Sequence, residues 1–535
     1  MVVLGISAYY HDSAAALIVD GKVTAAICEE RLSRIKHDKS FPKRAIAFCV
    51  EYSGIAYTDI DYVVFYEKPI RKFERILTTH IFHAPKGFKT FVKAMPIWLK
   101  ERLNIKQTIM KSLNELCHCK INWDIRFIEH HLSHAAMAYF TSPFESAAIL
   151  VVDAVGENAT TSLFKASGYK IESIKQQSFP NSVGLLYSAF TYFLGFQVNS
   201  DEYKIMGLAP YGDLYAKQTQ RFINIIKTKL VRIGDDGSII INQKYFTFMV
   251  GLRMVDDHMW TKLFGIAKRE TNAPIRTEHK NLAIAIQNVI EEIFLKLATH
   301  IKSLTQCNNL CISGGCALNC SAMEKIKGNG LFSNVFVPFA PGDDGGAIGA
   351  ALVFHALMSG KRYMSDISPY QGCSFKNEEV ERAIKEENLE FNFVQEENLY
   401  DEIAFSLSHG NIVGWFQGRM EFGPRALGNR SILADPRVFS MKDRVNAKVK
   451  YREAFRPFAP VVTQDDASHF FEDSNSPFMM FTTQVRIDTT LIPAVTHVDN
   501  TARIQTVTET SNIRLYKLLK AFENYSKIPI LLNTS

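Results

Sequence analysis

The feature of this sequence that most limits its fold is a pattern of strand, turn, strand, turn and strand that occurs twice. In the first copy, an apolar run from Val2 to Ser7 leads through a polar turn to a second run, Ala14 to Val19, and an Asp20-Gly21 turn. The second copy begins at Ala147 and reads AAILVVDA, GENATT, SLFKA, SGYK and IESIKQQ. Asp-Gly between apolar runs is typical of a β-hairpin. The repetition predicts a duplicated fold with a ligand in the cleft between its two lobes.

The length and composition of the chain indicate a multidomain globular protein. With 535 residues it is too long for a single core. The hydrophobic share of 47%, the charged share of 22% and the net charge of +6 give no reason to expect nucleic acid or a membrane as a partner. The start, MVVLGISAYYHDS, lacks the features of a signal peptide, and no apolar run reaches the ~20 residues that span a bilayer. Nine cysteines in so long a chain are sparse and indicate reduced thiols, so we expect a cytoplasmic protein.

Two histidines and an aspartate have the spacing of metal ligands. His130 and His134 are four residues apart in FIEHHLSHAAMAYF, so on one helix they lie one turn apart on the same face. Asp153 ends a Val/Ile-rich strand, which presents its carboxylate at the edge of a sheet. Two imidazoles and one carboxylate leave coordination positions open, as in metal sites that take part in chemistry. The alternative is a capped helix with incidental histidines before a core strand.

Two glycine-rich turns further along have the character of ligand-binding turns. Gly314 and Gly315 break a short strand before a helix, and paired glycines let a nucleotide approach the backbone. Asp343, in PGDDGG, lies at another strand-to-helix turn and is a candidate fourth metal ligand, although carboxylates before glycines are also common in ordinary turns. Four cysteines nearby lack the CxxC pairs of zinc sites, so we do not expect zinc there: Cys307, Cys311, Cys316 and Cys320.

A basic and aromatic stretch runs from Lys68 to Lys106, between the two copies. Its cations alternate with aromatic residues such as Phe73, Phe82 and Trp98. One interpretation is a surface for nucleic acid or another anionic ligand. The other, which we favour, is a helical cap whose lysines extend their charged ends into solvent.

Seven motifs resemble those of a known family. In chain order they are GISAYYHDSAAALIVDG, EERLSRIKHD, HHLSHA, VVDAVGE, EYKIMGLAPYG, SGGCALNCSAMEKI and PGDDGGAIGA. Their content and order resemble the N-terminal domain of the NodU/CmcH family of O-carbamoyltransferases. The resemblance implies an α/β domain over residues 1–360 with the duplicated actin/Hsp70-like (ASKHA) fold of two RNase H-like lobes. In this implied domain, residues at about 66–120 form a helical basic insert.

The same resemblance implies roles for individual residues of this domain. His11 would be the base that takes a proton from the acceptor hydroxyl. Iron, Fe²⁺, or another divalent metal would be held by His130, His134, Asp153 and Asp343. The residues implied in binding an adenylate are Lys36, Gly156, Lys204, Gly207, Gly314, Gly315 and Asn319.

The last third of the chain has a different character. Arg425, Arg430 and Arg456 lie among glycines, prolines and apolar residues in GRMEFGPRALGNRSI and VKYREAFRPFAP. Guanidinium groups held in this way match phosphate oxygens two at a time. A structural ion-pair network is the alternative, but the acidic partners are fewer than the cations.

These two motifs resemble the YrdC-like C-terminal domain of the same family. The resemblance implies a linker at 361–370 and a second α/β domain at 371–535. Carbamoyl phosphate and ATP would be held there by Arg425, Arg430, Lys450, Arg456, Arg503, Asn533 and Ser535. The family pattern continues beyond the LLNTS at the end of this chain, so we expect a truncated second domain.

Together the resemblances imply a two-site enzyme. The second domain would make carbamoyl adenylate from carbamoyl phosphate and ATP, with Mg²⁺, and the first would pass the carbamoyl group to a hydroxyl of a small-molecule or sugar-containing acceptor. Two alternatives stay open: a tRNA-modifying carbamoyl transferase and a non-catalytic actin-like ATP-binding regulator. The sequence does not name the acceptor, and it leaves a homodimer open.

Overall fold

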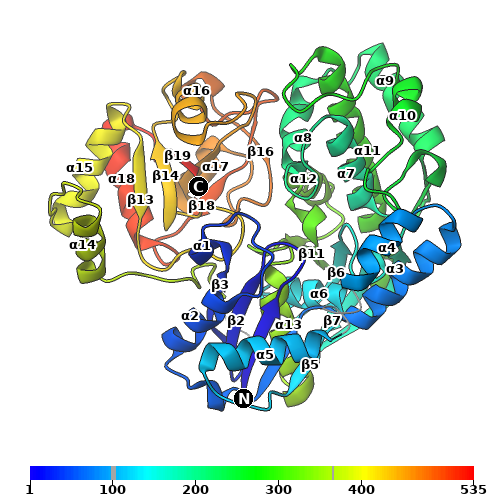
Figure 1. The fold of residues 1–535 in the computed structure, drawn as a ribbon. Helices are drawn as coiled ribbons and strands as arrows, with labels where there is room; N and C mark the ends of the chain where they lie inside the picture. The colour runs from blue at the N-terminus through cyan, green and yellow to red at the C-terminus, as the bar shows by residue number, and fades with distance from the viewer. Residues whose placement is uncertain (98–103, 364–366) are drawn as a thin grey trace. The chain divides into compact units, whose positions relative to one another are not determined.

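The computed structural model describes residues 1–97, 104–363 and 367–535, which form two compact units, Met1–Ile367 and Ser368–Ser535. Figure 1 colours the first unit from blue to green and the second from yellow to red. Within the expected linker, residues 364–366 lie outside the described residues. Arg362 donates to the carbonyls of Tyr139 and Ser142 in the first unit, and the Tyr370 hydroxyl donates to the carbonyl of Leu427 in the second.

The first sheet is built from the first copy of the repeated pattern. Its strands are β1 (Val2–Ser7), β2 (Ala14–Val19), β3 (Lys22–Cys28), β4 (Tyr62–Phe65) and β5 (Ile125–Phe127), in the order β3-β2-β1-β4-β5. β1, β2 and β3 are antiparallel, whereas β4 and β5 run parallel to β1. The interior positions of β1 and β2 are buried on both faces, as their continuous apolar runs predict.

The second sheet repeats this arrangement. Its strands are β6 (Ser146–Val152), β7 (Ala159–Ser167), β8 (Lys170–Ser178), β11 (Asn309–Ser313) and β12 (Asn334–Phe336), in the order β12-β11-β6-β7-β8. β6, β7 and β8 are antiparallel, and β11 and β12 are parallel to β6. Both sheets therefore have the same strand order and directions, which confirms the predicted duplication and the actin-like arrangement implied by the resemblance.

Two helices pack against each other between these sheets. α6 (His130–Phe140) packs on β6 and β11, and α13 (Gly345–Ser359) packs on β1 and β2. The two helices approach closely because a Cβ on Gly349 would lie 2.0 Å from the carbonyl oxygen of Ser133. A Cβ on Gly5 of β1 would likewise lie 2.0 Å from the carbonyl oxygen of Ala347. The small-residue sequence of α13 is therefore required by packing on both of its sides.

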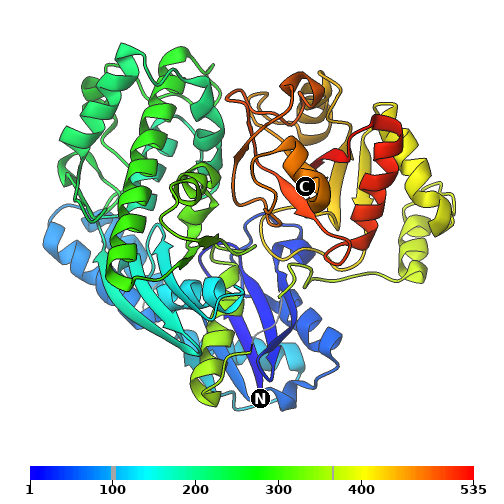
Figure 2. The same cartoon turned by 180° about the vertical axis from the view of Figure 1, so that it is seen from behind.

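The remaining elements of the first unit are mostly helical (Figures 1 and 2). α9 (Lys217–Ile225) continues into a π-helical turn at Ile226–Leu230. Trp98 and Lys100 of the basic stretch lie outside the described residues. The helices are α1 (Glu30–Ser33), α2 (Lys43–Ser53), α3 (Pro69–His83), α4 (Phe88–Ile97), α5 (Ile105–Cys117), α7 (Val183–Phe193), α8 (Glu202–Leu208), α9 (Lys217–Ile225), α10 (Asp257–Phe264), α11 (Thr277–Thr305) and α12 (Cys320–Gly328), and the hairpin is β9 (Val231–Ile233) with β10 (Ile239–Ile241).

The second unit is a mixed five-stranded sheet covered on both faces. Its order is β13-β14-β19-β15-β18, from β13 (Val413–Phe416), β14 (Arg430–Ala434), β15 (Ala459–Thr463), β18 (Gln505–Val507) and β19 (Ile530–Thr534). Along β19, Ile530 and Leu532 enter the core with α16 (Met441–Val445) and α17 (Gln464–Phe470). Leu531 enters the opposite core with α15 (Glu396–Ser408) and α18 (Ile513–Ser526), which Figure 2 shows against the sheet. The remaining elements are α14 (Asn377–Glu386), β16 (Thr483–Gln484) and β17 (Thr501–Ala502).

Among the residues that the structure describes in the two units, no helix combines the length and the apolar character that crossing a membrane requires.

Candidate metal centre

The two histidines of the predicted site lie at the start of α6. His130 and His134 are one turn apart and buried, and their Nε2 atoms are 3.1 Å from each other. The backbone N–H of His130, one of the groups left without a partner inside the helix, donates to a carboxylate oxygen of Glu157 at 3.0 Å. Because α6 is fixed on its other side by Gly349, both imidazoles have little room to move.

Asp153 follows β6 and is fixed by the paired glycines of the neighbouring strand. Its Oδ1 accepts a hydrogen bond from the backbone N–H of Gly315 at 3.2 Å. Gly314 has φ of +90°, and a Cβ there would lie 2.2 Å from the carbonyl oxygen of Val152, so only glycine fits this turn. Because the glycine at 314 lets the two backbones approach closely, the N–H of Gly315 reaches Asp153 and orients its carboxylate.

Asp343 completes the cluster from the turn before α13. Its Oδ1 lies 3.6 Å from Nε2 of His130 and 3.4 Å from Nε2 of His134. Asp153 Oδ2 lies 3.1 Å from Nε2 of His130 and 4.0 Å from that of His134. All four residues are buried, and the candidate ligand atoms lie within 4.8 Å of one another.

These residues fit a divalent metal ion. Ligand atoms bound tetrahedrally at ~2.1 Å lie about 3.4 Å apart, which matches most of the separations in the cluster. Nitrogen and carboxylate donors together are typical of zinc, iron and manganese sites. Two carboxylates would also neutralise the charge of a divalent cation in a buried place.

The electrostatics show how strongly the two carboxylates act on their neighbours. Burial by itself would lower the pKa of His130, but Asp343 and Asp153 outweigh it and raise that pKa to about 9. Burial would raise the pKa of both carboxyl groups, yet the histidines hold the pKa of Asp153 well below and that of Asp343 below the usual range. Burial, with His130 beside it, lowers the pKa of His131 to about 3, and its Nδ1 is bonded to the Ser162 hydroxyl at 2.7 Å. His131 is therefore neutral and is not part of the cluster.

His11 lies at the edge of this centre. Its Nε2 is 3.8 Å from Oδ2 of Asp343, and its Nδ1 is bonded to Oδ2 of Asp12 at 2.8 Å. The other oxygen of Asp12 is bonded to Nδ1 of His37 at 2.8 Å. Burial lowers the pKa of His11, but Asp343 and the hydrogen bond to Asp12 raise it to about 9. His11 was expected at the site from the sequence. Asp12 and His37 were not, because their only signal is the HD and KHD sequences of two turns.

The other residues expected around the nucleotide have varied surroundings. Lys36 lies on an exposed turn next to His37, and a Cβ on Gly156 would lie 2.9 Å from the ring of His130. Lys204 pairs with Asp201 at 3.1 Å, one residue before α8, which also carries Gly207. Asn319 caps α12, and its amide exchanges hydrogen bonds with that of Gln287. The structure thus places Gly156 beside the cluster of candidate metal ligands and holds the side chain of Asn319 between α12 and Gln287.

In the second unit, one carboxylate organises the arginine-containing loop. A single oxygen of Glu421 accepts the backbone N–H groups of Leu427, Asn429 and Arg430 at 2.8, 2.8 and 3.1 Å, which fixes the loop that includes Arg425. The side-chain amide of Asn533 donates to the carbonyl of Ala426 and to Gln505, so the end of β19 is joined to the same loop.

The other expected cations of this unit lie in neighbouring loops. The Lys450 ammonium contacts the carbonyl of Ser535, and Arg456 pairs with Glu453 at 3.6 Å. Arg503 precedes β18, two residues before Gln505. Arg425, Asn533, Lys450 and Ser535 are therefore connected through the end of β19.

Two family models match this chain, one in each unit. A family model described as the carbamoyltransferase N-terminus matches residues 2–352, and one described as the carbamoyltransferase C-terminus matches residues 404–535. The chain is thus a transferase of the carbamoyl class, and it belongs to the carbamoyltransferase family. This confirms the family resemblance of the sequence motifs.

Relatives at moderate identity cover most of the chain. An uncharacterised protein of Synechocystis is 44% identical, covering 100% of this chain and 91% of that protein. The nodulation protein NolNO of Sinorhizobium fredii is 36% identical over 98% of this chain and 74% of its own length. The 3'-hydroxymethylcephem-O-carbamoyltransferase of Streptomyces clavuligerus is 36% identical over 49% of each chain.

Proposed function

We propose that this protein is an ATP-dependent O-carbamoyltransferase that carbamoylates a hydroxyl group of a small-molecule or sugar-containing acceptor. The observation that carries the proposal is the buried cluster of His130, His134, Asp153 and Asp343 with His11 beside it at 3.8 Å. A family of carbamoyltransferases with a named O-carbamoyltransferase among its relatives supports the reaction class.

In the proposal, the second unit makes the activated donor. Carbamoyl phosphate is hydrolysed to carbamate and phosphate, and the carbamate oxygen then attacks the α-phosphorus of ATP, which releases pyrophosphate and leaves carbamoyl adenylate. Arg425, Arg430, Lys450, Arg456 and Arg503, with Asn533 and Ser535, would hold the phosphate groups. Fixed cations stabilise the charge that develops in such transfers, and Mg²⁺ would accompany ATP.

In the first unit, the acceptor hydroxyl attacks the carbonyl carbon of the adenylate and AMP leaves. His11 takes the hydroxyl proton at Nε2, while Asp12 holds Nδ1 and fixes the orientation of the ring. A divalent ion, Fe²⁺ or another, on the four ligands would polarise the carbamoyl oxygen and offset the field of Asp343 and Asp153 at His11. The glycine turn at Gly314 and Gly315 and the residues Lys36, Lys204, Gly207 and Asn319 would surround the adenylate.

The test separates donor formation from transfer. Pyrophosphate release from ATP is measured with and without carbamoyl phosphate, and radiolabelled carbamoyl transfer is then followed across a panel of hydroxyl compounds. We expect pyrophosphate release that requires both substrates. Release that does not depend on carbamoyl phosphate would contradict the proposed donor, and a labelled tRNA product would favour the tRNA-modifying alternative.

A further inference from the structure

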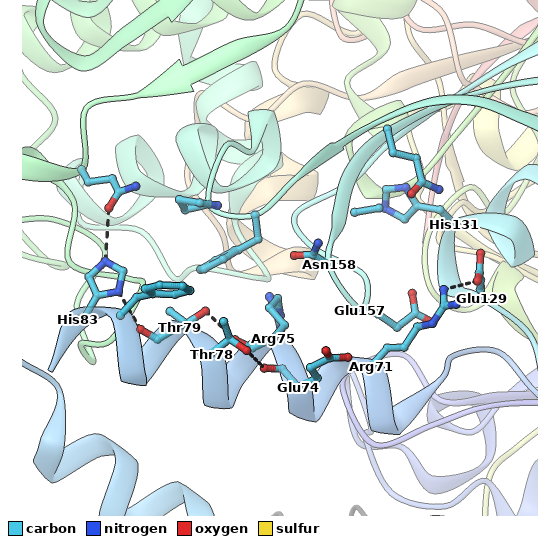
Figure 3. Close-up of a pocket in the computed structure, with 16 residues that line it drawn as sticks. Arg71, Glu74, Arg75, Thr78, Thr79, His83, Glu129, His131, Glu157 and Asn158 are labelled. Carbon is cyan, nitrogen blue, oxygen red and sulfur yellow. Dashed lines mark hydrogen bonds and ion pairs between the residues drawn. The ribbon is translucent and has the colours of Figure 1, made fainter.

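A large cavity lies beside α3 in the first unit, outside the cluster of metal ligands (Figure 3). Its volume of about 720 Å³ is within the ~300–1,000 Å³ of small-molecule pockets. We call it the α3 pocket. One side is a face of α3, and the other comes from the start of α6, the turn at 157–159 and the end of β8 with the Phe179-Pro180 segment.

The face of α3 that lines this pocket is polar apart from Phe82. The polar residues follow one another at helical spacing, so they form one continuous stripe: Arg71, Glu74, Arg75, Thr78, Thr79 and His83. Figure 3 shows this row of side chains along one side of the helix. The inward stripe of a helix in a globular protein is normally apolar. A polar stripe that faces a cavity indicates a site that holds a polar ligand.

The opposite wall of the pocket lies next to the cluster of four candidate metal ligands. One oxygen of Glu157 accepts the backbone N–H groups of both Lys68, at the start of α3, and His130, at the start of α6. His131 is 2% exposed, and its Nε2 has no hydrogen-bond partner among the residues that the structure describes, although the side chain lines the pocket. A buried polar atom of this kind costs free energy unless a ligand or water satisfies it.

The chemistry of the lining does not favour an anion. Two arginines are balanced by three glutamates, and Arg71 is already paired with Glu129. Amide groups of Asn158 and Gln176 add donors and acceptors. The ring of Phe179, with the Arg75 guanidinium 5.0 Å from its centroid, offers an apolar face. Hydroxyl-rich rings combine many hydrogen-bonding groups with apolar C–H faces and no charge, and they match this lining.

The helix α3 also contacts Tyr10, which packs against the ring of His11. The Lys72 ammonium, on α3, lies 4.9 Å from the centroid of the Tyr10 ring. The same ring is 4.5 Å, centroid to centroid, from the imidazole of His11. Tyr10 thus connects the helix that lines the pocket with the residue beside the cluster.

We propose that the α3 pocket binds the non-reacting part of the acceptor and that this acceptor is a carbohydrate or a similar neutral polyol. The inference rests on the proposed function, since it assigns an acceptor subsite to the same reaction. Glu157, Asn158 and the α3 stripe would bind its hydroxyl groups and leave one of them directed past Tyr10 toward His11.

The test uses glucose, N-acetylglucosamine and their β-1,4-linked dimers as probes, with binding to the full chain measured by saturation-transfer NMR and titration calorimetry. Thr78→Trp fills the pocket from an exposed position of α3, and Ile81→Trp adds the same bulk to the same helix at a residue that is 64% exposed and does not line the pocket. We expect saturable binding of at least one probe, weakened about 10-fold or more in Thr78→Trp and unchanged in Ile81→Trp. Melting temperatures of both variants check that the fold is kept.

Two results would overturn the inference. One is a wild-type protein that binds no probe, which removes the carbohydrate class. The other is a Thr78→Trp variant that binds as well as the wild type, which removes the pocket. Pyrophosphate release by the wild-type protein reports separately on the proposed function, so its failure and that of the acceptor pocket are distinguishable.

Discussion

Asp12 joins two histidines that are 26 residues apart, because one of its oxygens is 2.8 Å from Nδ1 of His11 and the other is 2.8 Å from Nδ1 of His37. Asp12 has φ of +52°, an uncommon backbone conformation that aims its side chain at both rings. Nε2 of His11 is left facing Asp343 and the cluster. The arrangement is one in which a carboxylate fixes the orientation of an imidazole.

Asp12→Asn keeps the size of the side chain but removes its charge and one acceptor. We expect carbamoyl transfer to fall by about 10-fold or more, because an amide no longer fixes the orientation and tautomer of His11. Transfer from preformed carbamoyl adenylate measures this step. Pyrophosphate release, which we propose for the other unit, should stay unchanged. A wild-type transfer rate would mean that Asp12 only stabilises its turn.

His11→Asn tests the base itself. It preserves polarity but removes the group that accepts the hydroxyl proton, so we expect transfer to fall by about 100-fold or more. Metal content should be retained, because His11 is not among the four ligands. A variant that loses its metal would show that His11 is a ligand, and the set of four would have to be revised.

His134→Ala removes one of the two imidazoles. We expect loss of stoichiometric metal, measured by elemental analysis, together with loss of acceptor carbamoylation. For metal content, His131→Asn is the matched control, because His131 is a buried neighbour on the same helix that is bonded to Ser162 instead. Unchanged metal content in His134→Ala would disprove the assignment.

Arg456→Ala separates the two half-reactions. We expect adenylate formation to be lost, because a fixed charge leaves the phosphate site, while transfer of preformed adenylate continues. Glu453→Gln is the control, since it breaks the ion pair of Arg456 and keeps the guanidinium. If both variants lose adenylate formation equally, Arg456 has only a structural role.

Gly349→Ala tests how far metal binding by the four candidate ligands depends on the packing of α6 against α13. The new Cβ would lie 2.0 Å from the carbonyl oxygen of Ser133, so α6 and α13 must separate, at a cost of about 1–3 kcal/mol. We expect a lower melting temperature and weaker metal binding, because α6 carries both histidines. Gly328→Ala on α12, where the nearest atom is 3.6 Å away, should change neither. Wild-type metal affinity in Gly349→Ala would show that the ligands adjust to the packing.

The positions of the repeated strands could be predicted from the sequence alone. β1 and β2 have the predicted bounds because continuous apolar runs between turn residues leave few alternatives. The duplication could be predicted because both copies begin with the same three elements. The pairing of β6 with β11 could not, because strands about 160 residues apart carry no local signal of their register.

Part of the candidate site could also be predicted from the sequence, and part could not. His130 and His134 are related by local helical geometry, whereas Asp343 was ambiguous until the structure brought its turn to α6. The bond between Asp12 and His37 depends on two left-handed residues in separate turns, which propensity does not reveal. The basic stretch was expected to form a helical cap whose lysines extend into solvent, and the sequence did not indicate that two of its arginines, Arg71 and Arg75, line a pocket together with glutamates.

The helix α3, whose polar face lines the pocket, lies in the connection between β4 and β5 of the first sheet. Between β4 and β5 the described residues form the helices α3, α4 and α5, whereas the equivalent connection between β11 and β12 contains the short turn at Gly315–Leu318 and α12. None of the four candidate metal ligands lies on this segment. Acceptor preference could therefore diverge through changes in α3 while the reaction centre stays as it is, and exchanging this segment between relatives is a direct way to redirect the enzyme to another hydroxyl compound.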